Sequence, residues 1–274
     1  MRGPYFSLPE MIRPRDAAMQ IYVCIKHVPD TAANIRPLGG TDFDETVKFI
    51  MNPYDEYALE QALQIREKEG GSEVIAVTVG KESAAVTLRS ALAMGADRGI
   101  LVKTDSYFTD SLETSRLLKK AIDIDGSPGL IFTGKQSVDT EGMQIPFRLA
   151  ALFDLPVVVN VVAFSMAGGT VTVEREMEED VHEVIEMSIP CIVGAAKGLN
   201  RPRCPTLPDM MKAKKKELKV VNRADLRIQK SIQSVELLEL QPVADRGRGR
   251  ILKGSPENMV RELLRLLRDE AKVL

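Results

Sequence analysis

Short apolar segments alternate with segments of helical periodicity along residues 19–200 of the chain. Continuous apolar runs that end in a glycine or a turn predict buried strands, because a strand covered on both faces does not alternate apolar and polar residues. The strands expected on this basis lie at 21–26, 73–80, 99–103, 129–134 and 155–164.

Apolar residues at helical spacing predict helices between these strands. The clearest helix follows Asn52, which we expect to cap it, and Pro53 occupies its first turn, where a missing N–H costs nothing. Gly70 and Gly71 are expected to end this helix. Further helices are expected at 83–94, 109–122 and 143–153.

This alternation predicts an α/β fold whose parallel sheet is covered by helices on both faces. Such sheets bind ligands in the crevice at the carboxyl ends of their strands. The turns at Pro29 and Asn52 and the glycines Gly80 and Gly134 all fall at those ends. The sequence therefore places a binding site at that edge of the sheet.

The chain changes character towards its C-terminus. Residues 170–176 and 183–188 alternate apolar and polar side chains, which is typical of an antiparallel pair near the edge or cover of a sheet. Residues 201–250 are rich in proline, lysine and arginine and show little periodicity, which predicts an extended arm lying on another molecule. A helix with one apolar stripe is expected at 256–272.

Composition and charge add limits to this picture. The chain has 274 residues, 44% of them apolar, which is enough for a sizeable core. Charged residues make up 28% and leave a net charge of −2, so nothing global points to nucleic acid. No apolar run is long enough for direct membrane insertion. Residues 1–18 lack the apolar centre of a secretory signal and are expected to be disordered or misassigned.

The common signatures of catalytic and metal sites are missing from the sequence. GxSxG, CxxC, HExxH and Walker sequences do not occur, and the three widely spaced cysteines favour a reduced, cytoplasmic setting without a metal site. His27 is better explained as a hydrogen-bonded loop residue than as a base. The acids around Glu174 and Glu179 are better explained as a solvated strand edge than as a cation site. A cofactor is therefore expected to carry the chemistry.

The segment TGKQSVDTEGMQIP, residues 133–146, leaves a buried strand through a glycine and enters a helix. A glycine at a strand exit lets backbone N–H groups approach a phosphate, and a helix N-terminus adds partial positive charge. Thr133, Lys135, Gln136 and Thr140 supply further donors. An ordinary strand-to-helix connection explains the same spacing, so both interpretations stay open at this point.

A second segment, RPRCPTLPDMMKAKKKELKVV at 201–221, sets Leu207, Met210 and Met211 beside a run of lysines. An exposed apolar anchor beside a basic patch suits docking to an acidic protein surface. Nucleic acid is the rival partner for a lysine run. This run is short, contains no aromatic residue and belongs to a chain of negative net charge, so we expect no nucleic acid.

Several segments together resemble the beta subunit of electron transfer flavoprotein: IYVCIKHVPDT, IMNPYDEYALEQAL, ALAMGADRGI, TGKQSVD, VEREMEE and PTLPDMMKAKKK. They occur in the family's order and spacing from Met19 to the C-terminus. The resemblance implies a Rossmann-like, adenine-nucleotide-binding three-layer sandwich at 19–200. It also implies that residues 201–274 form a recognition loop and an arm with a helix that wraps an alpha subunit, which carries most of the FAD.

The activity implied by the resemblance is electron transport without catalytic residues of the chain's own. The FAD would take electrons from an acyl-CoA dehydrogenase, as in fatty acid beta-oxidation, or from a similar flavin dehydrogenase. A quinone or iron–sulfur oxidoreductase would receive them. Tyr54 and Thr31 match positions that approach the flavin, and Glu174 to Glu176 match a segment thought to restrain the flavin domain.

The resemblance also implies the residues of two sites. Leu207 would insert into an apolar pocket on the dehydrogenase, within a recognition set of Arg203, Thr206, Leu207, Pro208, Met210, Met211 and Lys212. The residues implied in a structural AMP site are Cys24, Asn52, Pro53, Tyr54, Asp55, Val79, Gly134, Lys135, Gln136, Ser137, Val138, Asp139, Thr140, Glu141, Gly142, Met143, Gln144 and Ile145.

The identity of the ligand in this beta site stays open. The loop departs from the usual family sequence at Thr140, Glu141, Gly142 and Ile145. A subset of the family holds a second FAD there and splits electron pairs from NADH, and the opening CIKxVPDT is common in that subset. The segment MNPYDEYALEQAL is more similar to the AMP-binding kind, so we expect AMP, with a second FAD as the alternative. A stand-alone nucleotide-binding module of similar fold is a third interpretation, against which the proline-rich arm argues.

Overall fold

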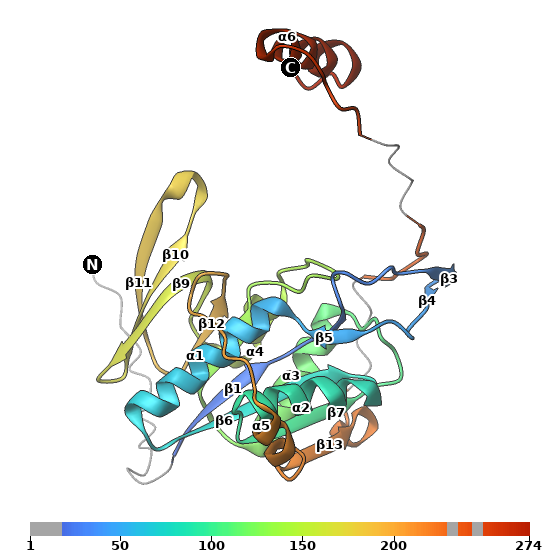
Figure 1. Ribbon diagram of the computed structural model, residues 1–274. Coiled ribbons are helices and arrows are strands. Elements are labelled where there is room, and N and C mark those ends of the chain that lie inside the picture. Colours follow the sequence, from blue (N-terminus) through green and yellow to red (C-terminus); the bar gives the residue numbers. More distant parts are fainter. Residues whose placement is uncertain (1–17, 229–234, 243–248) are drawn as a thin grey trace, which may run out of the picture.

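A nine-stranded sheet forms the centre of the molecule in the computed structural model, which describes residues 18–228, 235–242 and 249–274. The expected N-terminal extension therefore lies outside the described residues, apart from Ala18. Strand order in the sheet is β11-β10-β9-β12-β8-β1-β6-β7-β13, and Figure 1 labels these strands apart from β8. The strands are β1 (Met19–Cys24), β6 (Ser72–Gly80), β7 (Arg98–Lys103), β8 (Pro128–Gly134), β9 (Val157–Ala167), β10 (Thr170–Glu176), β11 (His182–Ser188), β12 (Cys191–Ala195) and β13 (Leu218–Asn222).

Strand directions match the expected parallel sheet with an antiparallel edge. All neighbouring pairs from β9 to β13 in this order are parallel, whereas β10 pairs antiparallel with both β9 and β11. Two small antiparallel pairs lie outside the sheet: β2 (His27–Pro29) with β5 (Phe49–Met51), and β3 (Pro37–Gly39) with β4 (Asp42–Phe43). Their formation brings the segment between β1 and the first helix back over itself.

Helices cover both faces of the sheet. On one face α1 (Pro53–Glu69), η1 (Glu82–Ala84) and α2 (Ala85–Met94) pack with side chains such as Ile21 and Val23 in one apolar cluster. On the other face α3 (Ser111–Asp125) and α4 (Ile145–Phe153) pack with Tyr22 and Ile75 in a second cluster. The three-layer α/β architecture expected from the alternating pattern is confirmed, with helix ends shifted by up to three residues.

The structure corrects the expectation of an irregular arm directly after residue 200. Residues of the recognition set form helix α5 (Leu207–Ala213), and β13 then joins the edge of the sheet beside β7. A short turn, η3 (Arg223–Leu226), follows. In β13 every residue is at least partly exposed, so its sequence carried no apolar run that would predict a strand.

Hydrogen bonds from two cationic side chains join the C-terminal ends of helices α2 and α5. Lys216, just beyond α5, donates from Nζ to the carbonyl oxygens of Leu92 at 3.0 Å and Ala96 at 2.6 Å, at the C-terminus of α2. Arg89 of α2 donates in return to the carbonyls of Ala213 and Lys216, both at 2.8 Å. Because each cation satisfies carbonyls that a helix end leaves unpaired, α5 is fixed to the domain.

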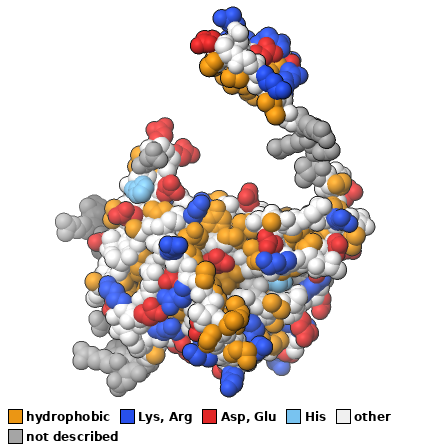
Figure 2. Space-filling model, viewed as in Figure 1, with side chains coloured by type: hydrophobic (Ala, Val, Ile, Leu, Met, Phe, Trp, Pro, Cys, Tyr) orange, Lys and Arg blue, Asp and Glu red, His pale blue; other side chains and the backbone are white. Residues whose placement is uncertain are grey.

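The last helix stands apart from the sheet in Figure 1. Residues 235–242 touch the domain, with Leu240 N–H donating to the Gly40 carbonyl at 2.7 Å. Helix α6 (Pro256–Arg265) continues into a turn, η4 (Leu266–Glu270), and none of its residues is buried. Hydrophobic and charged side chains occupy different sides of it in Figure 2. Among the described helices, none has the length and apolar character needed for a membrane span.

Candidate functional site

The predicted binding edge lies where strand order reverses, between β1 and β8. From β1 the chain builds β6 and β7 on one side, and β8, β12 and β9 on the other. A reversal of this kind leaves a crevice at the carboxyl ends of the two central strands. The N-terminus of α1 and the loop 135–144, which we call the β8 loop, both come to this point.

Asp55 ties the three chain segments of the crevice together. Its carboxylate accepts hydrogen bonds from Lys26 N–H at 2.7 Å, from Gly134 N–H at 3.0 Å and from the side-chain amide of Asn52 at 2.9 Å. Asp55 is 4% exposed, and burial raises its pKa to about 7 although all three donors favour the ionised form. The carboxylate therefore serves as an internal brace rather than a solvent-facing ligand group.

One expectation from the sequence is wrong at this brace. Asn52 occupies the N-cap position of α1 but makes no side-chain cap bond there. Its amide instead donates to the Gln136 carbonyl at 2.9 Å and accepts from Val138 N–H at 3.1 Å. The N–H of Gly134 donates to Asp55 at 3.0 Å.

The glycine itself is required for a different reason. A Cβ at Gly134 would lie 2.4 Å from Asp55 Oδ1 and 2.7 Å from Tyr54 Cβ. Both distances are shorter than van der Waals contact allows, so only glycine lets α1 approach the end of β8 this closely. Tyr54 is half-buried and lies under the ammonium of Lys135, 5.3 Å from the ring centroid.

Asp139 fixes the far half of the β8 loop. Lys26 Nζ lies 2.7 Å from Asp139 Oδ2 and 3.3 Å from each of the hydroxyls of Ser137 and Thr140. Tyr107 donates its hydroxyl to Asp139 at 2.9 Å. Burial would raise the pKa of Asp139, but the Lys26 charge and these hydrogen bonds hold it below its usual range. Asp139 is therefore ionised at neutral pH.

Sequence reasoning missed Lys26 and Tyr107. Lys26 follows β1 closely, so its place beside the predicted crevice was a usable signal. Tyr107 lies in the loop after β7, and no local pattern indicates that it reaches a residue 32 positions away.

Backbone N–H groups of the β8 loop remain available for a ligand. Among the described residues, the N–H groups of Gln136, Asp139 and Thr140 donate to no other group, whereas Lys135 N–H donates to the Ala195 carbonyl at 2.8 Å. Glu141 and Met143 adopt positive φ angles of 48° and 51°. Gln144 is turned aside, since its side-chain oxygen accepts from Ser111 at 2.6 Å and from Arg148.

Three apolar residues of the implied AMP site lie in one cluster of the core. Cys24, Val79 and Ile145 belong to the same apolar cluster on the α3 and α4 face of the sheet. Burial raises the pKa of the Cys24 thiol to about 12, so the thiol stays protonated. Thr133, at the end of β8, is 3% exposed, and its hydroxyl has no hydrogen-bond partner among the described residues.

Several groups at this edge of the sheet are of the kinds that bind an adenosine phosphate. Unpaired backbone N–H groups suit a phosphate and apolar side chains suit a purine ring, whereas the Lys26 ammonium is already paired with Asp139. The buried Thr133 hydroxyl is a polar group that a ligand atom would satisfy. The structure brings the implied residues of the AMP site to one edge of the sheet; their role in binding stays a prediction.

The recognition set forms a separate, exposed feature around α5. Thr206 and Asp209 make a capping box at its start, with Thr206 Oγ1 2.6 Å from Asp209 Oδ2. Leu207 is 77% exposed and Met211 62%. Hydrophobic side chains gather over α5 in Figure 2. Pro208 and Met210 are exposed on the same helix.

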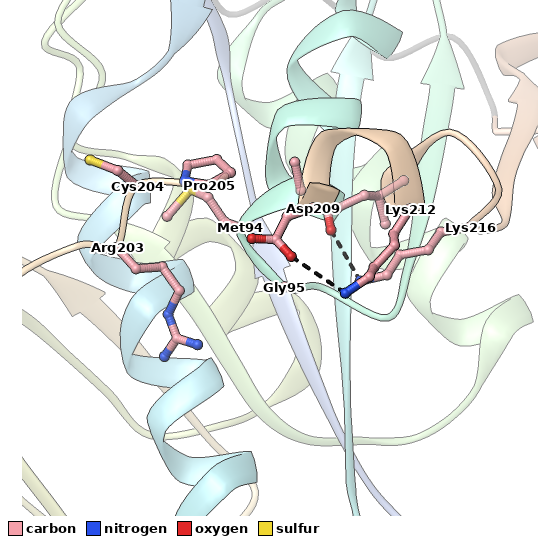
Figure 3. A pocket seen from close by; sticks show the side chains of 10 residues that line it. Met94, Gly95, Arg203, Cys204, Pro205, Asp209, Lys212 and Lys216 are labelled. Atoms are coloured by element: carbon pink, nitrogen blue, oxygen red, sulfur yellow. Dashed lines mark hydrogen bonds and ion pairs between the residues drawn. The ribbon is translucent and has the colours of Figure 1, made fainter. Parts of the chain in front are cut away.

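Arg203, also a member of the recognition set, is less exposed than Leu207 and Met211 and is paired within the chain. Its guanidinium forms a fork with two acids of α1, 2.8 Å from Glu60 Oε2 and 2.6 Å from Glu67 Oε1. Figure 3 shows Arg203 turned towards α1, beside a cavity that Asp209, Lys212 and Lys216 also line. Arg203 therefore fixes the segment that leads into α5.

The remaining candidates form no further site. His27 stacks on Phe49 with ring centroids 4.4 Å apart and hydrogen-bonds Thr87 at 2.7 Å, so the expected hydrogen bond is present, but the residue lies in strand β2 and not in a loop. Thr31 is exposed. Arg175 pairs with Glu183 across the edge hairpin at 2.7 Å. Within the described ranges, no three His, Cys, Asp or Glu residues gather as a metal-binding group.

Comparisons with known proteins agree with one another. The family model described as "Electron transfer flavoprotein domain" matches residues 41–226. "Electron transfer flavoprotein subunit beta" of Bacillus subtilis is 37% identical over 260 residues, covering 93% of this chain and 100% of that protein. The mitochondrial protein of the same name from Arabidopsis thaliana is 38% identical over 261 residues, with the same coverage. "Protein FixA" of Sinorhizobium fredii is 39% identical over 221 residues, covering 77% of this chain and 76% of that protein.

Proposed function

Because the chain belongs to the electron transfer flavoprotein family as a beta subunit, we propose that it pairs with an alpha subunit and supports an FAD that carries electrons between proteins. The FAD, when bound, supplies the redox chemistry. The observation that carries this proposal is the match to beta subunits over 93% of the chain, supported by the reversal of strand order at the edge of the sheet where ligands bind in such folds. The chain itself needs no catalytic residue for this role.

Pairing with the alpha subunit is supported by the C-terminal helix. Val260, Leu263 and Leu264 of α6 are each about half exposed and lack a cover within the described chain. An amphipathic helix of this length is marginal in water unless its apolar face packs on something. We propose that this face lies on the alpha subunit.

In the crevice we propose AMP, held for structural support. The unpaired N–H groups of Gln136, Asp139 and Thr140 and the Lys26 ammonium would hold its phosphate, and Cys24, Val79 and Ile145 would line its base. Lys26 is neutralised by Asp139, so the backbone donors are expected to carry most of the phosphate recognition. A second FAD in the same crevice is the alternative, and it would make the protein a bifurcating, NADH-dependent variant.

The donor is proposed to dock on α5. Leu207 would enter an apolar pocket on an acyl-CoA dehydrogenase or a similar flavin dehydrogenase, flanked by Met211 and the lysines that follow. A quinone or iron–sulfur oxidoreductase is the proposed acceptor. Cytoplasmic location remains part of the proposal.

Reduction of the assembled complex tests this function. The chain is co-expressed with an alpha subunit, and the absorbance of the purified complex is followed in two anaerobic mixtures. We expect a catalytic amount of acyl-CoA dehydrogenase with acyl-CoA to bleach the flavin, and NADH alone to leave it oxidised. Rapid bleaching by NADH alone would favour the bifurcating alternative. A chain that stays monomeric and gains no flavin beside an alpha subunit would contradict both.

A further inference from the structure

Tyr107 touches two parts of the molecule at once. Its hydroxyl donates to Asp139 of the β8 loop at 2.9 Å. Its ring packs edge-on against Phe43, with centroids 5.1 Å apart and an interplanar angle of 73°, and against Phe49 at 5.8 Å and 66°. The same side chain therefore contacts the proposed nucleotide site and the small strand pairs that follow β1.

The contact with Asp139 is well defined. The side chain of Asp139 is 10% exposed, and its carboxylate is held by Lys26, by Tyr107 and by the hydroxyl of Ser137 within its own loop. Burial and the neighbouring Asp139 charge raise the pKa of Tyr107, so its hydroxyl keeps the proton that it donates. Asn52 hydrogen-bonds the backbone of Gln136 and Val138 in the first half of the β8 loop. Tyr107 and Lys26 hold the second half through Asp139.

The ring contacts reach residues 27–51, which we call the flavin-facing segment. Phe43 lies in β4 and Phe49 in β5, and Phe49 stacks on His27 with centroids 4.4 Å apart. The segment includes Thr31, which the family resemblance places near the flavin of the alpha subunit. Packed aromatic rings cannot move independently, because each edge-on contact leaves little free volume.

We propose that Tyr107 is a positioning residue that couples occupancy of the nucleotide site to the position of the flavin-facing segment. The inference rests on the proposed function. A phosphate that binds the Asp139 and Thr140 N–H groups shifts or fixes the β8 loop, and the Tyr107 hydroxyl follows Asp139. The Tyr107 ring then restricts the positions of the Phe43 and Phe49 rings that it packs against. The nucleotide thereby contributes to electron transfer by ordering the flavin-facing segment, and takes no part in the redox reaction itself.

Calorimetric titration tests the nucleotide side of this coupling. The complex with the alpha subunit is stripped of bound nucleotide and titrated with AMP. Tyr107→Phe keeps the ring but removes the hydrogen bond to a charged acceptor, so we expect AMP to bind about 10-fold more weakly. Tyr57→Phe removes the same atom from a tyrosine on α1 and is expected to leave AMP affinity unchanged. Equal affinity in Tyr107→Phe and wild type would overturn the proposal.

Hydrogen exchange tests the coupling itself. In the wild-type complex, AMP is expected to slow amide exchange both in residues 135–144 and in residues 27–51. In Tyr107→Leu, which removes the ring contacts, AMP should still protect 135–144 but no longer protect 27–51. A purely structural tyrosine would not separate these two responses. Equal AMP-induced protection of 27–51 in both proteins would contradict the coupling.

A double-substitution cycle keeps the proposal testable should Tyr107→Leu fail to assemble. If the hydroxyl acts through Asp139, then adding Tyr107→Phe to Asp139→Asn should weaken AMP binding by less than about 2-fold further. Fully additive losses would overturn the proposal. Failure of the proposed function is recognised separately: a wild-type complex that binds no AMP sinks both claims, whereas normal AMP binding with an unaffected Tyr107→Phe sinks the coupling alone.

Discussion

Asp55→Ala is expected to lower the free energy of unfolding by about 3–5 kcal/mol, because it leaves several donors buried without an acceptor. The carboxylate is the common acceptor of Lys26 N–H, Gly134 N–H and the Asn52 amide. These donors come from the end of β1, the end of β8 and the start of α1. Their loss therefore loosens the crevice as well as the core, and bound nucleotide should be lost with it.

Denaturant titration of the complex measures this effect. Glu56→Ala is the matched control, since Glu56 is the next acid of α1, is half-buried and makes no hydrogen bond among the described residues. The control is expected to stay within about 0.5 kcal/mol of wild type. If Asp55→Ala loses no more stability than the Glu56→Ala control, the Asp55 hydrogen bonds do not stabilise the fold.

Leu207→Ala should slow electron transfer from the dehydrogenase about 5- to 150-fold at low protein concentration, through weaker docking by about 1–3 kcal/mol. Leu207 is 77% exposed on a helix whose start is capped by Thr206 and whose end is held by Arg89. A rigid, exposed apolar anchor gains binding energy without the entropic cost of ordering a loop. Flavin content and stability should stay unchanged, because the side chain packs on little of its own domain.

Stopped-flow reduction by the dehydrogenase, measured against protein concentration, separates docking from chemistry. The expected change is in the concentration dependence, with the rate at saturation largely kept. Ile124→Ala is the control, as Ile124 is 55% exposed on α3, on the opposite face of the sheet. If Leu207→Ala and Ile124→Ala react alike, α5 is not the docking surface.

The sheet and its main helices could be predicted from the sequence because their signals are local. Val74 to Val77 form an unbroken apolar run, and α1 starts at a proline and ends before two glycines. Strand β13 escaped prediction because an edge strand leaves its side chains partly exposed. Helix α5 is short and is held by two hydrogen-bonding cations. Arg89 reaches from α2 to the end of α5, and Lys216 reaches from beyond α5 to the end of α2. Spacing along the chain does not reveal such contacts.

The sequence predicted where the candidate site lies in the fold but not which residues hydrogen-bond one another there. The crevice followed from where the strands end, a property of the fold. The partners of Gly134 and Asp139 did not, because they lie 79 and 32 residues away and depend on side-chain direction. A glycine at a strand exit suggested a phosphate contact, whereas the structure shows that this glycine lets Asp55 approach and accept its N–H; phosphate binding further along the loop stays a prediction.

The nucleotide content of the purified complex tests the central claim most directly. Ligands released by denaturation from the complex of this chain with its alpha subunit are separated and quantified against protein. The account predicts one FAD and one AMP for each pair of subunits. Two FAD and no AMP would contradict it.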